Sequence, residues 1–126
     1  MVQTDLTQLT RECGSWKESL RNSRSELSGY RNKLQEVVSL PISKAALPQV
    51  EHYDNQFDIQ LTNINHLKHA IKEHEKLAEW EIHHPNDQRA EELWAKHESL
   101  HEQYQYLEHT LTELKSEFNS FVSRIA

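Results

Sequence analysis

Residues 6–37 read LTQLTRECGSWKESLRNSRSELSGYRNKLQEV, and their apolar side chains recur at alternating intervals of three and four residues. Polar Ser23 occupies the one skipped position. The repeat comprises Leu6, Leu9, Cys13, Trp16, Leu20, Leu27, Tyr30, Leu34 and Val37. An apolar repeat with this period predicts a long helix that packs along a coiled-coil seam.

The same period returns in two later segments. The last segment carries it at Ala90, Leu93, His97, Leu100, Tyr104, Leu107, Leu111, Leu114, Phe118, Phe121 and Ile125. The middle segment has apolar residues at strict sevens, Val50, Phe57, Ile64, Ile71 and Ala78, flanked by Tyr53, Leu61, Leu67 and Ile82. This wider apolar face favours packing against two helices rather than one.

Two short breaks that contain proline separate the three segments, one from Leu40 to Pro48 and one from His83 to Asp87. Short connections make consecutive helices antiparallel. We therefore predict an all-α fold, an up-down-up antiparallel three-helix bundle of long coiled-coil-like helices in a single domain, residues 1–126. The helices are expected at about 5–39, 48–83 and 87–125, with Asp5 capping the first and Asn86 or Asp87 the third.

Three features resemble the architecture of a spectrin-type three-helix repeat: the long helices, the three-segment length and Trp16 on the first seam. The resemblance is one of shape and involves no specific motif. It implies the bundle and carries no function.

Composition and charge narrow the classes of function. A formal net charge of -6 argues against a general nucleic-acid surface, which needs clustered lysine and arginine. No apolar run is long enough to span a bilayer, so no membrane partner is expected. The single cysteine, Cys13, has no partner for an internal disulfide, which fits a reducing compartment. We expect a soluble, cytoplasmic protein.

Nine histidines are many for a chain of this length, and two of them fall on inner helix faces. His97 occupies a seam position, and His74 lies where an apolar residue would be expected. A hairpin turning near Pro85 places these two side by side, and the first turn brings Cys13 to the level of His74. The three residues could therefore form one polar layer, with one residue from each helix.

A thiolate and two imidazoles are a sensible zinc ligand set, with water in the fourth position. Cys13, His74 and His97 are therefore candidate metal ligands, although the chain lacks a local motif such as Cys-x-x-Cys. The alternative is a buried polar layer that specifies helix register and binds no metal. His69-x-x-x-Glu73 and His97-x-x-x-His101 have the spacing of di-iron ligands. A di-iron site is disfavoured because the first predicted helix contains no histidine and the chain offers no fourth helix.

Features typical of enzymes are missing from the sequence. It contains neither a Gly-rich phosphate loop nor a Gly-x-Ser-x-Gly elbow, and a seam position would bury the Cys13 thiol. Trp80 and Trp94 lie off the strict seams near Pro85, where they either widen the core or form an interaction surface.

The leading hypothesis is a non-enzymatic helical module that needs no cofactor and binds a protein partner or its own copy. The alternative is a metal-binding or sensor protein that uses the Cys/His layer, with zinc as the metal. A small-ligand carrier is a third class, with the polar layer as its only support.

Overall fold

A computed structural model shows three long helices packed against one another, and it describes residues 2–41 and 44–125, with side chains from Leu6 onward. The α-helices are α1 (Val2–Val38), α2 (Leu47–His83) and α3 (Asp87–Ile125), and a short 3-10 turn, η1 (Lys44–Ala46), precedes α2. No strand occurs within the described ranges. The all-α, three-helix prediction is confirmed.

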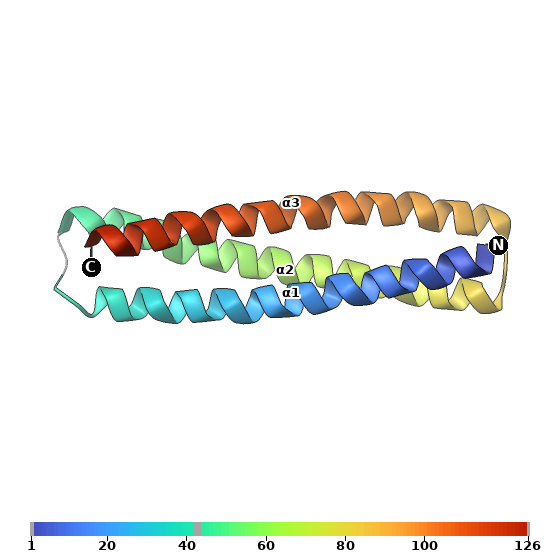
Figure 1. The fold of residues 1–126 in the computed structure, drawn as a ribbon, viewed down its shortest axis with the longest axis horizontal. Coiled ribbons are helices and arrows are strands. Elements are labelled where there is room, and N and C mark those ends of the chain that lie inside the picture. The colour runs from blue at the N-terminus through green and yellow to red at the C-terminus, as the bar shows by residue number, and fades with distance from the viewer. Residues whose placement is uncertain (1, 42–43, 126) are drawn as a thin grey trace.

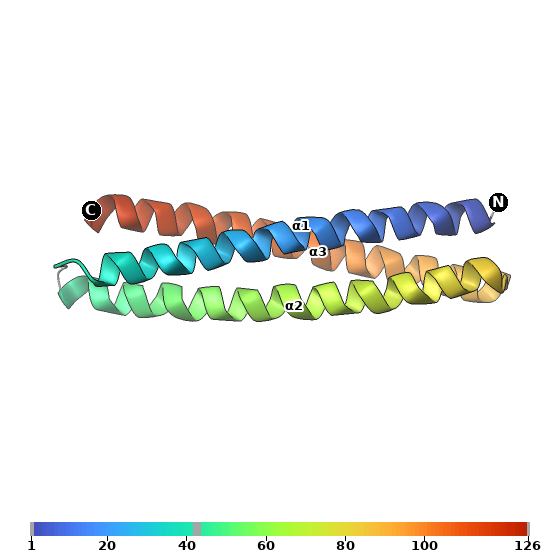
Figure 2. The same ribbon diagram turned by 90° about the horizontal axis from the view of Figure 1, so that it is seen from below.

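The helices run up, down and up along one rod (Figure 1). α1 and α3 run in the same direction, and α2 is antiparallel to both, as the turned view also shows (Figure 2). The N-terminal end of α1 therefore lies beside the α2–α3 turn, and the C-terminal end of α3 lies beside the first connection. No described helix combines the length and the apolar composition needed to cross a membrane.

Helix bounds follow the expected ones closely. α2 and α3 begin within one residue of the expected positions, and Pro48 lies in the first turn of α2, where its missing N–H has no helical partner to lose. α1 begins at Val2, three residues before the expected start, because no helix breaker precedes Asp5. Asp5 therefore lies inside α1 and is not its N-cap, so the expected capping position is wrong.

The seam residues form one continuous core. Most residues at the predicted seven-residue spacing are buried, and Phe57, Ile64, Ile71, Phe118 and Phe121 have no exposed surface. Three seam residues, Tyr30, Tyr104 and Ile125, are half-buried and pack against this core. Towards the first connection the core is aromatic. Tyr53 lies 5.1 Å from Phe121 and Phe57 lies 5.1 Å from Phe118, measured between ring centroids. Such pairs add directional contacts to the burial of apolar area.

Ion pairs flank the apolar core. Lys17 Nζ lies 2.5 Å from Glu75 Oε1, and Arg31 approaches Asp54 and Asp58 on α2 at 3.8 Å. These contacts join basic residues of α1 to the more acidic second helix. Because the Arg31 pairs are largely exposed, each contributes less than about 1 kcal/mol.

The α2–α3 turn is held by a buried carboxylate, Glu81, which is 1% exposed. It accepts hydrogen bonds from the backbone N–H of Asn86 and, at 2.7 Å, from Arg89 Nε. Asn86 in turn caps α3, because its Oδ1 accepts from the Arg89 N–H at 3.0 Å. Glu81 therefore fixes where α2 ends and α3 begins.

Replacing Glu81 with Ala should lower the free energy of unfolding by about 1–3 kcal/mol, because the Asn86 N–H and Arg89 lose their partner. Urea unfolding followed by circular dichroism measures this change. Glu79→Ala, on the exposed side of the same turn, is the matched control and should stay within about 0.5 kcal/mol of the parent. Equal effects of the two substitutions would contradict a special role for Glu81.

Gly29 lies inside α1, and a Cβ placed on it would meet no atom within 4 Å. Gly29→Ala should therefore raise the free energy of unfolding by about 0.5–1 kcal/mol, because alanine has less backbone freedom to lose on folding. A higher urea midpoint with an unchanged slope is the expected result. A lower midpoint would mean that the helices approach more closely at Gly29 than described.

Candidate functional site

The three side chains predicted to share one level meet in the interior of the bundle. Cys13 comes from α1, His74 from α2 and His97 from α3, and all three are buried. His74 Nε2 lies 3.2 Å from His97 Nδ1, and Cys13 Sγ lies 4.0 Å from the same nitrogen. One donor atom from each residue lies within 4.8 Å of the other two. We call these residues the Cys/His layer.

His97 is the centre of this layer, and its ring is held on several sides. Nε2 lies 2.9 Å from Glu12 Oε1, and the ring stacks on Trp16 with centroids 4.5 Å apart. Trp94 packs edge-on against the ring at 5.3 Å. Because the Glu12 carboxylate only accepts hydrogen bonds, Nε2 carries the proton, and the Nδ1 lone pair of neutral His97 faces His74 and Cys13. The hydrogen bond from His97 lowers the pKa of Glu12, so this carboxylate is ionised at neutral pH.

The tautomer of His74 follows from that of His97. With His97 Nδ1 as an acceptor, His74 Nε2–H is the donor of their 3.2 Å hydrogen bond. Its other nitrogen, Nδ1, is buried without a hydrogen-bond partner. Burial, with a contribution from neighbouring His97, lowers the pKa of His74 to about 4. His74 is therefore neutral at physiological pH.

Cys13 is a poor nucleophile in this environment. Burial, helped by the negative charge of Glu75, raises the pKa of its thiol to about 12, so the reactive thiolate is scarce. The sulfur still points at two imidazoles and can coordinate a metal ion once its proton is displaced. The layer therefore suits metal coordination better than covalent catalysis.

Two residues that contact the surroundings of the layer do not follow from the seven-residue pattern. Glu12 lies off the seam but directly before Cys13, so it can reach across to α3. His101, one turn after His97, stacks on Trp16 at 5.3 Å. The His97-x-x-x-His101 spacing is a signal that both rings lie on one helix face.

The di-iron alternative finds no support in the arrangement. His69, Glu73 and His101 are exposed, while the nitrogens of His97 face Glu12 and His74. Within the described part of the chain, Cys13, His74 and His97 are the single group of three such residues close enough to share a metal ion.

The two tryptophans near the α2–α3 turn differ in environment. Trp80 is 51% exposed, and it stacks on His84 at 4.2 Å with the Arg89 guanidinium 5.1 Å from its ring. Leu77, one turn earlier, is 60% exposed. Trp94 is half-buried and packs on the core against His97. The exposed apolar feature at this end is therefore the pair Leu77 and Trp80.

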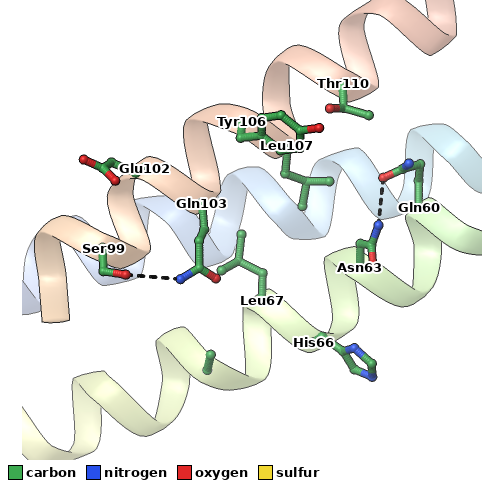
Figure 3. A pocket seen from close by; sticks show the side chains of 11 residues that line it. Gln60, Asn63, His66, Leu67, Ser99, Glu102, Gln103, Tyr106, Leu107 and Thr110 are labelled. Atoms are coloured by element: carbon green, nitrogen blue, oxygen red, sulfur yellow. Dashed lines mark hydrogen bonds between the residues drawn. The ribbon is translucent and has the colours of Figure 1, made fainter.

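An open groove of about 750 Å3 runs between α2 and α3 near the middle of the rod (Figure 3). Leu67 and Leu107 form its floor, and polar side chains line its walls. Several of these side chains already bond to one another, with Gln60 accepting from Asn63 at 3.2 Å and Ser99 accepting from Gln103 at 3.4 Å. The groove has no charged or aromatic arrangement that identifies a ligand class.

No family model, curated protein or solved structure matches the chain.

The contribution of His74 to the free energy of unfolding of the metal-free protein should fall by about 3 kcal/mol as the pH drops from 6.5 to about 4. Above this range His74 is neutral in both states, and within it only the unfolded chain takes up the proton. The titratable and charged groups near His74 are His97 and Lys96 on α3 and Cys13 on α1. The parent protein and the control variant described next both contain these groups.

Urea titrations in the presence of a chelator, run at several pH values, measure this dependence. His74→Leu is the control, because it removes the titrating group and keeps the layer filled. The difference between the two curves should grow with falling pH and level off near pH 4. Parallel curves would show that His74 titrates normally in the folded protein.

Proposed function

We propose that this chain is a non-enzymatic helical module that associates with a second copy of itself through the outer face of α2 near the α2–α3 turn. The observation that carries the proposal is the exposure of Leu77 and Trp80 on adjacent turns of α2, at 60% and 51%. Tryptophan is enriched among residues that dominate binding energy at protein interfaces. A helix face of this kind pairs with an equivalent helix about a two-fold axis.

The charges around this surface favour a second copy. Glu73 and Lys76 border it and form an ion pair at 3.7 Å, so the surface is close to neutral although the chain carries a net charge of -6. Two copies can therefore meet here without bringing like charges together, and Lys76 of one copy can approach Glu73 of the other. The small apolar area suits weak association, with a dissociation constant on the order of 10 µM.

The chemistry of the core supports a non-enzymatic role. The candidate nucleophile, Cys13, is buried and its pKa is raised to about 12. Its histidine neighbours are buried and bond to each other and to Glu12, and the groove between α2 and α3 is lined by other residues. The free, buried thiol of Cys13 fits a reducing compartment, which supports a cytoplasmic location.

Sedimentation velocity from about 1 to about 200 µM tests the proposal, a range that brackets weak self-association. The parent should move from monomer towards dimer, and the double variant L77A/W80A should weaken this association by at least about tenfold. Fold is checked by circular dichroism, and Arg89 keeps its bond to Glu81 in the variant.

Ile59→Ala is the matched control, because Ile59 is 48% exposed on the same helix but lies several turns away. It should leave the dissociation constant unchanged. A parent that stays monomeric throughout, or an Ile59→Ala variant that loses association equally, would overturn the proposal. The runs are repeated with chelator, so that any effect of bound metal is kept separate.

A further inference from the structure

We propose that Cys13, His74 and His97 form a binding site for one zinc ion, with Glu12 as the residue that positions His97. The proposal goes beyond self-association and does not depend on it. It rests on three donor atoms from three different helices that lie within 4.8 Å of one another in the core. The ligand atoms are Cys13 Sγ, His74 Nε2 and His97 Nδ1.

The separation of the two histidine nitrogens fits a tetrahedral metal site, and the cysteine sulfur lies close to it. Zinc bonds of about 2.0–2.1 Å to nitrogen and 2.3 Å to sulfur place two nitrogens about 3.3 Å apart and a sulfur about 3.6 Å from each. The observed distance between His74 Nε2 and His97 Nδ1 is 3.2 Å, and Cys13 Sγ lies 4.0 Å from His97 Nδ1. Shifts of a few tenths of an ångström bring these two pairs to coordination distance. The third pair, Cys13 Sγ and the His74 donor, lies within 4.8 Å, so a rotation of the Cys13 side chain towards His74 of up to about 1 Å completes the set.

His97 is already oriented as a metal ligand. Its Nε2–H donates to the Glu12 carboxylate at 2.9 Å, an arrangement that fixes the tautomer and makes the opposite nitrogen more basic. Stacking on Trp16 and the edge-on contact from Trp94 hold the plane of the ring. The Nδ1 lone pair consequently points at the other two donors before any ion arrives.

The protons and charges of the site balance. On zinc binding, Cys13 loses its thiol proton to solvent, and the His74 proton moves from Nε2 to Nδ1, the nitrogen that is without a partner. The thiolate then carries one negative charge, and the carboxylate of Glu12 supplies a second through His97. These two charges offset those of Zn²⁺, which a buried site requires. Water can occupy the fourth position.

The donor types select the metal class. Calcium and magnesium prefer sets of oxygen ligands, whereas a thiolate with two imidazoles suits zinc and related metals such as cobalt and copper. Cobalt(II) is therefore a useful spectroscopic substitute for zinc, since a bound thiolate adds a charge-transfer band to the spectrum.

The experiment uses the whole chain, produced without a polyhistidine tag and purified without chelator. Metal content is measured by mass spectrometry, and cobalt(II) is titrated into metal-free protein and then displaced by zinc. We expect one metal ion per chain, with the thiolate charge-transfer band. Cys13→Ser should abolish that band and weaken zinc binding by more than about 100-fold, beyond the loss expected from an outer contact.

Glu12→Gln keeps an acceptor for His97 Nε2–H but removes the charge, and the Glu12 side chain lies partly outside the core. It should weaken zinc binding by about 10–100-fold and change the unfolding of the metal-free protein much less, because Gln still accepts the His97 Nε2–H. This variant keeps the test valid even if Cys13→Ser fails to fold. A merely structural role for Glu12 would instead move stability and not affinity.

His101→Gln is the matched control, because His101 stacks on the same Trp16 but is exposed and lies outside the ligand set. Its zinc affinity should equal that of the parent. Binding through surface histidines would survive Cys13→Ser and lack the thiolate band. That result, or the absence of stoichiometric binding by the parent, would overturn the proposal and identify the layer as a polar layer that fixes register.

Discussion

The register of the three helices depends on side-chain contacts alone, because each helix satisfies its backbone hydrogen bonds internally. A seven-residue repeat leaves this register ambiguous, since sliding one helix by a heptad again places apolar residues opposite apolar residues. Buried polar groups remove the ambiguity. His97 reaches both Glu12 on α1 and His74 on α2 in one alignment, and Glu81 finds its partners only when α3 starts at the observed turn. The polar core residues therefore determine the helix register, and the apolar residues stabilise the bundle in that register.

The two halves of the core divide these tasks. Towards the first connection, Tyr53, Phe57, Phe118 and Phe121 pack ring against ring. Towards the α2–α3 turn, apolar contacts give way to the Cys/His layer, where one nitrogen of His74 stays unpaired. Such a layer costs stability relative to an apolar one unless something further uses its lone pairs. The exposed pair Leu77 and Trp80, where self-association is proposed, is separate from this layer, because Trp94 rather than Trp80 contacts His97.

Periodicity alone predicted most of the backbone. Helix bounds followed from the seams and the prolines, and equal rise per residue in antiparallel helices was enough to bring Cys13, His74 and His97 to one level.

What the sequence could not supply depends on side-chain rotamers and on how far side chains reach between helices. Glu12 lies off the seam, and only the observed packing shows that it extends to His97. Glu81 is buried, although a charged side chain is normally expected at the surface. Its partners come from the α2–α3 turn, and the seven-residue repeat does not define the path of that turn. Likewise, Trp80 and Trp94 look alike in sequence, and small differences in helix rotation leave one exposed and the other half-buried.

The position of Cys13 near one end of α1 determines how the layer communicates with solvent. Only about three helical turns precede it, and within the core these turns are anchored by Leu6 and Leu9, with Gly14 directly after the cysteine. Release of this short section would uncover the sulfur and His97 while the α2–α3 hairpin stays paired, a partial opening that requires much less free energy than global unfolding. The exchange rate of any species held in the layer would then follow the opening rate of α1, and amide hydrogen exchange in the first turns would report it. Access to a site assembled from three helices in this way would depend on local opening of α1 and would not require a channel.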